Sequence, residues 1–380
     1  MRVRQLVPMA WALALMGLGA SPARAVEGPM ARTLPVGLRL VKVAEREPET
    51  PFAVHPSGEK VAYLRYGLRV QDLDSGAERV LDPTSPTALA WAPDGKVLAA
   101  AFVQNEKTTL RLFFEGEAKA ETRIQGRVTA LAWSAGPNLL AFSIRQEAFR
   151  FGTRLTEVLF RWNGKAAPTE TVLCDTTMLP ATAAKWAATF PHTLTFALSP
   201  LQDEILYSRL HNPPAYDPRL KVMLHHLDSG QERLITEASM GSGGGVFSGQ
   251  GDRVLVGDGL ATSRLLDPWE GKELYTLPVA GRRAALSTSG HYSLLDGRLY
   301  REGVLFATFP GDCVGSFSPQ GGTLFLAQGG HLYRLSGLAE NTCLPMEPQN
   351  VSRLQKWRKW LSEGLVTSAE YALERSKVRP

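Results

Sequence analysis

The sequence predicts an all-β protein, a seven-bladed β-propeller, followed by a short C-terminal α-helical hairpin. The first observation is residues 87–114, where an apolar run, a Pro-Asp-Gly turn, a second apolar run and an alternating run follow one another. This succession of strands and tight turns makes most of one four-stranded blade. The second observation is that the pattern recurs along most of the chain. The third is a change to helical periodicity in residues 351–380.

The repeat occurs in seven copies, each with a residue at the same place in the turn between its first two strands. These residues are Gly58, Gly95, Gly136, Gln202, Gly251, Gly290 and Gly321. A four-stranded blade takes about 40 to 45 residues. The wider spacings therefore indicate blades with inserted loops, and the narrow last spacing indicates a trimmed blade. Alternative counts are six and eight blades.

Two repeated motifs resemble those of the WD-repeat family and, more closely, the shorter repeats of the TolB-type bacterial propellers. One is an Ala/Ser-Pro-x-Gly turn after an apolar strand. The other is Leu-Asp-Ser-Gly-x-Glu-Arg at 73–79 and again at 227–233. The resemblance covers residues 50–338 and implies the propeller architecture. No Trp-Asp dipeptide closes a blade and no Gly-His opens one, so no specific WD-repeat function follows, because one fold serves many functions.

The N-terminus has the features of a secretory signal peptide. Arg2 and Arg4 give a positive start, residues 6–20 are apolar, and residues 23–25 form a small-x-small cleavage site. We expect cleavage after Ala25 and a periplasmic or otherwise exported protein. The alternative, a membrane anchor, requires about 20 apolar residues, and this interrupted run is shorter. No stable membrane insertion is therefore expected.

The predicted units are a signal peptide (1–25), a propeller (26–345) and a helical hairpin (346–380). The formal net charge of the whole chain is +5, but its basic excess lies in the signal and the hairpin, which leaves the propeller near neutral. A near-neutral body without an aromatic-basic stripe argues against nucleic-acid binding.

The short segment 36–43 precedes the first full repeat and alternates between apolar and polar residues. We expect this strand to close the ring by pairing with the seventh blade near Leu332 and Leu335. The alternative is an ordinary first strand of blade one. Two insertions break the repeat. Segment 174–192 is Ala-rich and could form a short helix, and segment 211–218 is Pro-rich. Such loops are either recognition elements or caps of the propeller edge.

The tail is predicted to form two helices. In the first, Ser352 is the expected N-cap, Leu354 and Leu361 share a face with Trp357, and Gly364 ends the helix in the left-handed conformation. In the second, Thr367-x-x-Glu370 is a capping box.

The tail resembles the short C-terminal helical hairpin called SHOCT, through Gly364-x-Val366-Thr367-x-x-Glu370-Tyr371 and Lys377. That resemblance implies association with itself or with a partner. Two helices of this length cannot bury a core alone. Candidate docking residues are Trp357, Trp360 and Tyr371, with a partner chain and the propeller's own flank as alternative docking surfaces.

Residues that could carry chemistry are scattered. Cys174, Cys313 and Cys343 fit no metal spacing, and in an oxidising compartment we expect a disulfide between Cys313 and Cys343. His225 and His226 are adjacent in a strand, so their side chains point to opposite faces. We predict no catalytic residues, no metal site and no cofactor.

The strands expected to line the channel contain one histidine, His55, and no carboxylate. These strands are 53–55, 88–91, 130–133, 195–198, 246–248, 284–287 and 315–318. Glycoside hydrolysis, for example, needs a pair of carboxylates. The composition of these strands therefore argues against an enzyme that uses the channel.

The loops that lead into these strands carry a mildly cationic set of residues at one mouth of the channel. They are Arg127, His192, Arg282 and Arg283, opposed by Asp82 and Asp312. This candidate partner-binding rim could receive an acidic peptide or an anionic ligand. The alternative is a set of solvated loop charges.

The sequence thus indicates an exported, non-catalytic propeller scaffold that binds a protein partner in a bacterial cell envelope. The alternative function is a small-ligand-binding sensor or enzyme that uses the channel mouth. A further alternative is that the hairpin mediates self-association and that the propeller is mainly structural.

Overall fold

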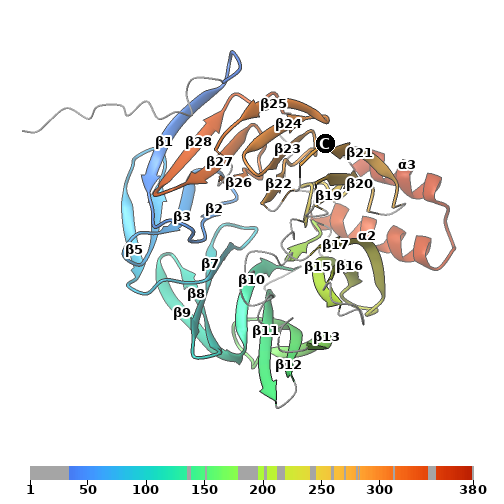
Figure 1. The fold of residues 1–380 in the computed structure, drawn as a ribbon, viewed down its shortest axis with the longest axis horizontal. Helices are drawn as coiled ribbons and strands as arrows, with labels where there is room; N and C mark the ends of the chain where they lie inside the picture. Colours follow the sequence, from blue (N-terminus) through green and yellow to red (C-terminus); the bar gives the residue numbers. More distant parts are fainter. Residues whose placement is uncertain are drawn as a thin grey trace, which may run out of the picture.

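The structure is a computed structural model of the 380-residue chain. It describes residues 34–134, 138–149, 152–178, 196–200, 203–211, 219–239, 245–257, 261–268, 271–279, 281, 283–310, 313–340 and 348–378. The described strands form seven four-stranded antiparallel sheets arranged as a ring (Figure 1). The predicted seven-bladed propeller is confirmed.

Each blade runs from an inner strand at the channel to an outer strand at the perimeter. Blades 1 to 3 are β2 (Ala53–Val54), β3 (Lys60–Leu64), β4 (Leu68–Asp72), β5 (Glu78–Asp82); β6 (Ala88–Trp91), β7 (Val97–Gln104), β8 (Lys107–Phe114), β9 (Glu117–Gln125); and β10 (Arg127–Trp133), β11 (Leu139–Phe149), β12 (Gly152–Trp162), β13 (Thr169–Met178). Blades 4 and 5 are β14 (Phe196–Leu198), β15 (Glu204–His211), β16 (Arg219–His226), β17 (Glu232–Ser239); and β18 (Gly245–Phe247), β19 (Val254–Gly257), β20 (Ser263–Leu266), β21 (Glu273–Leu277). Blades 6 and 7 are β22 (Ala284–Leu286), β23 (Tyr292–Leu295), β24 (Arg298–Arg301), β25 (Val304–Thr308); and β26 (Val314–Phe317), β27 (Thr323–Gln328), β28 (His331–Ser336), β1 (Arg39–Glu45).

The first strand of the chain closes the ring. β1 is the outer strand of blade 7 and pairs antiparallel with β28, with Leu40 opposite Leu335 and Ala44 opposite Leu332. This confirms the predicted closing strand. The two insertions lie mostly outside the described residues: β13 extends to Met178 and β15 to His211. The expected helix in segment 174–192 therefore stays a prediction, as do the unit boundaries.

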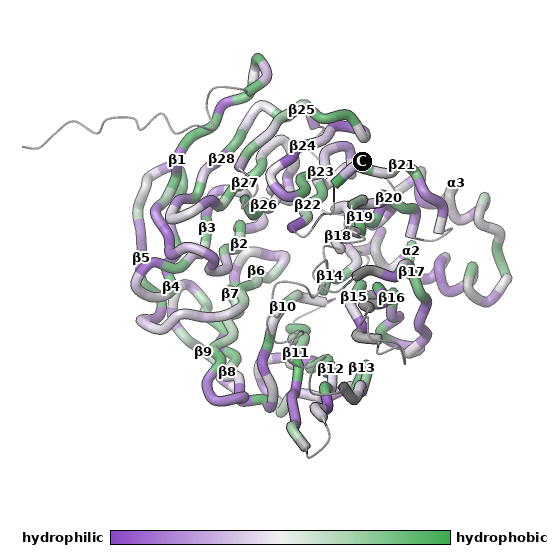
Figure 2. Tube along the Cα trace, viewed as in Figure 1, coloured by the Kyte–Doolittle hydropathy of each residue, from purple (hydrophilic) through white to green (hydrophobic). Residues whose placement is uncertain are grey.

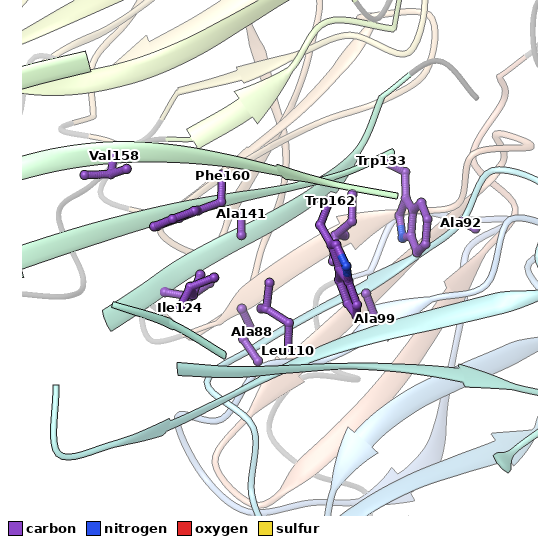
Figure 3. Packing of buried hydrophobic residues seen from close by; sticks show 13 residues of the cluster. Ala88, Ala92, Ala99, Leu110, Ile124, Trp133, Ala141, Val158, Phe160 and Trp162 are labelled. Carbon is purple, nitrogen blue, oxygen red and sulfur yellow. The ribbon is translucent and has the colours of Figure 1, made fainter. Parts of the chain in front are cut away.

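The hydrophobic core lies between the blades rather than at one centre. Seven clusters of buried residues each join two neighbouring blades, one cluster for every seam of the ring. Figure 3 shows the cluster between blades 2 and 3, where Leu110 and Ile124 meet Trp133, Phe160 and Trp162. Hydrophobic residues follow the strands, while many turns are hydrophilic (Figure 2). A single blade could not bury its faces alone.

Every outer strand contains a β-bulge. The register between the third and fourth strand of each blade shifts by one residue on the outer strand. An extra residue in an edge strand increases its twist and disrupts the ladder locally, which makes pairing with another sheet less favourable. These bulges were not among the features predicted from the sequence.

The glycines that mark the repeat adopt the left-handed conformation wherever the turn is described. Their φ angles are 72° (Gly58), 71° (Gly95), 70° (Gly251), 74° (Gly290) and 79° (Gly321). At Gly95 a Cβ atom would overlap the imidazole of His55 in the preceding blade. This turn therefore needs glycine both for its φ angle and for the close approach of two blades.

We predict that Gly95→Ala destabilises the fold more than Gly76→Ala. Both glycines have φ near +71°, which a Cβ makes unfavourable by about 1–2 kcal/mol. Only at Gly95 does the new Cβ also meet a neighbouring blade, which adds about 1–3 kcal/mol of overpacking. The free energy of unfolding in urea measures both losses. Equal losses would show that the contact between Gly95 and His55 does not contribute to stability.

Candidate functional site

The channel is bordered by the inner strands, whose inward edges have no strand partner. Side chains from neighbouring blades bind some of their carbonyl groups. The indole N–H of Trp91 donates to Ala53 O at 3.3 Å, and that of Trp133 donates to Ala90 O at 3.1 Å. The hydroxyl of Thr87 donates to Val128 O at 3.1 Å. These bonds join blades 1, 2 and 3 beside the channel and satisfy backbone acceptors there.

His55 is the one histidine in the inner-strand segments, and both of its ring nitrogens are engaged. Nε2 donates to Gly95 O at 2.9 Å, because a carbonyl oxygen only accepts. Nδ1 then accepts from the backbone N–H of Ser57 at 3.1 Å. The ring also lies edge-on to Trp91, with centroids 4.8 Å apart. This histidine connects blades 1 and 2, and neither nitrogen is available to bind a substrate or metal.

Two residues of the candidate rim are described. Arg127 is exposed at the first residue of β10, in blade 3. Arg283 is half-buried just before β22, in blade 6, and its backbone N–H donates to Asp296 Oδ1 at 2.9 Å. Both lie where the chain enters an inner strand, but blades 4 and 5 separate them on one side of the ring. Arg127 and Arg283 therefore do not contact each other.

The other predicted rim residues divide into two groups. His192, Arg282 and Asp312 lie outside the described residues. Asp82, expected to oppose the cationic set, is buried and paired with Arg111 at 2.5 Å. It also accepts from the backbone N–H of Thr84 at 2.8 Å. Asp82 thus fixes the loop between blades 1 and 2 and contributes little negative charge to the rim.

The C-terminal hairpin consists of α2 (Pro348–Ser362) and α3 (Ser368–Val378). The first helix begins four residues before Ser352, so the expected N-cap there was wrong; a proline is favoured in a first turn because its missing N–H has no intrahelical role. Gly364 has φ 71° and ends the helix as predicted. The capping box is also confirmed: Thr367 N donates to Glu370 Oε2 at 2.7 Å, and Glu370 N donates to Thr367 Oγ1 at 3.3 Å.

The three candidate docking residues take different positions in the hairpin. Tyr371 is buried with Leu354 in a small core between the helices, and Trp357 packs against it. Burial raises the pKa of Tyr371. Trp360 is half-buried and meets Trp357 edge-on, with ring centroids 5.6 Å apart. The Lys356 ammonium lies 4.9 Å from the Trp360 ring.

The hairpin is bound to the propeller by a buried ionic cluster. Arg358 donates to Asp203 Oδ1 at 2.8 Å and also pairs with Glu204; all three residues are buried. Asp203 and Glu204 lie at the start of β15, in blade 4. Burial lowers the pKa of Arg358, and the charge and hydrogen bond of Asp203 oppose this effect. The hairpin thus contacts the propeller's own flank through Arg358 (Figure 1), and docking through the three candidate aromatic residues stays a prediction.

Sequence reasoning missed Arg358 and its partners. They are 155 positions apart in the chain, so no local pattern connects them. One signal was present: Arg358 shares the apolar face of the helix with Leu354 and Leu361, where a charged residue requires a partner. A second tail contact was also missed: Glu340 accepts a hydrogen bond from Ser289 N, in blade 6, at 2.9 Å.

Two cysteines are described, and both are buried. Cys174 lies in β13, where its sulfur accepts from Arg209 Nε of blade 4 at 3.1 Å, and burial raises the pKa of its thiol. Cys313 precedes β26 at the seam between blades 6 and 7. Cys343 lies outside the described residues, so the Cys313–Cys343 disulfide stays a prediction.

No three His, Cys, Asp or Glu side chains gather where they could bind a metal ion, within the part of the chain that is described. Among those same residues, no helix has the length and apolar character needed to cross a membrane.

No known protein family and no curated protein matches the sequence. Solved structures do match the fold. The β-propeller domain of Cps50 (Swd1) from Myceliophteria thermophila is 16% identical, with a TM-score of 0.53 over 79% of this chain and 99% of that chain. Hydrazine synthase from Kuenenia stuttgartiensis is 11% identical, with a TM-score of 0.53 over 79% and 99%. A chain of the mitotic checkpoint complex is 13% identical, with a TM-score of 0.56 over 87% and 100%. At these identities the likeness shows the fold alone, a β-propeller.

We predict that Arg358→Ala releases the hairpin from the propeller. Removal of one partner leaves two buried carboxylates without their cation, a loss of about 3–5 kcal/mol in comparable sites. Hydrogen exchange in residues 349–378 should then become fast while the blades stay protected. The control is Lys359→Ala, because that side chain is 73% exposed and its pairing with Glu363 is long at 3.9 Å. An Arg358→Ala hairpin as protected as the native one would contradict the proposed anchor.

We predict different reactivity for the three cysteines. Cys174 should resist alkylation in the folded protein, because burial raises its pKa and limits access. Cys313 and Cys343 should resist alkylation even after unfolding until a reductant is added, because we expect them to be disulfide-bonded. Peptide mass analysis with and without reductant distinguishes the two cases. Alkylation of Cys343 in the unreduced, unfolded protein would rule out the disulfide.

Proposed function

We propose that this protein is an exported, non-catalytic scaffold whose propeller binds a protein partner in a bacterial cell envelope. The observation that carries the proposal is the engagement of His55. His55, the one histidine of the inner strands that the structure describes, uses both ring nitrogens to connect blades 1 and 2, and indole and hydroxyl groups bind neighbouring inner-strand carbonyls. The described inner strands thus serve to hold the ring together, and the loops at its ends present the variable side chains.

The location in the envelope rests on the signal-like segment 1–25. Partner binding is supported by the fold, because similar propellers occur in the mitotic checkpoint complex and in Cps50 (Swd1). A rigid ring with loops at its rims suits recognition of another protein. We further propose that the repeats are of the TolB type and that the tail is a SHOCT-like hairpin.

The proposed contact surface is the rim that includes Arg127 and Arg283, together with His192 and Arg282 of the same loops. A partner segment rich in Asp and Glu would complement these charges. The Asp82–Arg111 pair favours this assignment, because it neutralises the carboxylate that would repel such a segment.

A second candidate function is a small-ligand sensor or enzyme that uses the channel mouth. Its support is the similar fold of hydrazine synthase. Since neither nitrogen of His55 is available, this function would have to depend on residues of the rim loops.

We predict that the double variant Arg127→Glu, Arg283→Glu weakens partner binding by on the order of tenfold or more, since two attractive charges become repulsive. The partner is first captured by crosslinking in envelope extract, identified by mass, purified and titrated against each variant. The native interaction should also weaken with added salt, because exposed charges are screened.

The matched control is Lys96→Glu, Lys165→Glu, which reverses two exposed lysines at the opposite end of the ring. Equal weakening by both double variants would remove the rim as the binding surface. Failure to capture any protein from the extract would favour the small-ligand function instead.

A further inference from the structure

The outer strands of the seven blades differ in whether they contain charged residues, and this affects whether their free edges can pair with another strand. All seven contain a bulge, and six also contain charged residues that discourage pairing with another strand. One solvent-facing charge from each of these six strands is Lys42, Glu78, Lys119, Glu170, Glu237 and Glu273. β25, of blade 6, has the sequence VLFAT and contains none.

β25 also exposes more large hydrophobic side chains than any other described outer strand. Val304 is 70% exposed and Leu305 is 53% exposed. No other outer strand, in the part of the chain that is described, exposes two large hydrophobic residues. β25 pairs with β24 on one side and lies at the perimeter of the ring on the other (Figure 1).

We propose that β25 is the contact strand of a two-fold symmetric dimer, in which it pairs antiparallel with β25 of a second copy of this chain. A two-fold axis brings the same strand from both copies together. On the six charged edges, that pairing would bury charges or place like charges near one another. On β25, any register places only uncharged residues of Val304–Thr308 against each other, and the exposed aliphatic side chains become covered.

The charged residues nearest to β25 in the chain are compatible with this pairing. Arg301 and Glu302 precede the strand and have opposite signs, and the Arg301 guanidinium lies 5.8 Å from the Tyr292 ring. The hairpin is anchored on blade 4 through Arg358, so its anchor does not cover blade 6.

The strand is five residues long, so the contact is smaller than a standard stable interface. We therefore expect a reversible dimer of micromolar affinity rather than a permanent one. Such a dimer would present two rims to a partner, which raises avidity for any partner that has two binding segments.

The test is sedimentation velocity of the full chain after expression and purification, over a series of protein concentrations. The native protein should shift from monomer to dimer as concentration rises. Leu305→Lys should stay monomeric, because pairing would then place a charged lysine from each copy at the contact. The matched control is Leu234→Lys on β17, a residue that is 46% exposed on an edge already carrying charge; it should dimerise like the native protein.

Val304→Lys provides a second disrupting variant, and thermal unfolding of each variant shows whether it is folded. Hydrogen exchange at low and high protein concentration then locates the contact. Amides of Val304–Thr308 should gain protection at high concentration, while the other outer strands should not. A native protein that stays monomeric overturns the proposal, as does a dimer that survives both lysine substitutions or is lost equally in the β17 control.

Discussion

The pairing of β1 with β28 holds together a ring whose other seams follow from chain continuity. Each hydrophobic cluster lies between two blades, so every blade depends on both neighbours. Six seams join blades that are consecutive in sequence, whereas the seam between blades 7 and 1 joins the two ends of the propeller. Its cluster includes Ala44 of β1 together with Tyr63 and Phe325. Without β1, blade 7 would lose its outer strand and this seam would lose part of its core.

The inner and outer edge strands of each blade have backbone groups without a strand partner. Their surroundings differ, so these groups are treated differently at the two edges. At the channel, neighbouring inner strands are close enough for Trp91 and Trp133 to bind carbonyl groups of the preceding blade. At the perimeter, the outer edges face water, and bulges and charges disfavour their pairing with other sheets. β25 has the bulge but no charge, so its edge is the least protected of the seven.

The sequence predicted what depends on local pattern and missed what depends on distant contacts. Blade number, turn glycines such as Gly95, the closing strand and the capping box follow from periodicity and turn chemistry, and the structure confirms them. The bulges were missed because they depend on the pairing register of the third and fourth strands, which the sequence of one strand does not reveal. Arg358 and Asp82 were missed as paired residues, since each partner is far away or on another strand. The rim is only partly described, so its assignment still rests on sequence.

The two ends of the propeller make different contributions to the protein. The N-terminal strand closes a seam through hydrogen bonds and apolar packing. The chain after blade 7 leads away from that seam. Glu340, before the hairpin, binds blade 6, and Arg358, in the hairpin, binds blade 4. Apolar residues at the Arg358 site would hold the hairpin at least as strongly, because burying three charged groups costs much of what their attraction returns. What the ionic cluster adds is a fixed position, since a guanidinium must meet both carboxylates at once. The hairpin is therefore better understood as a surface element held in one orientation than as a device that strengthens the ring.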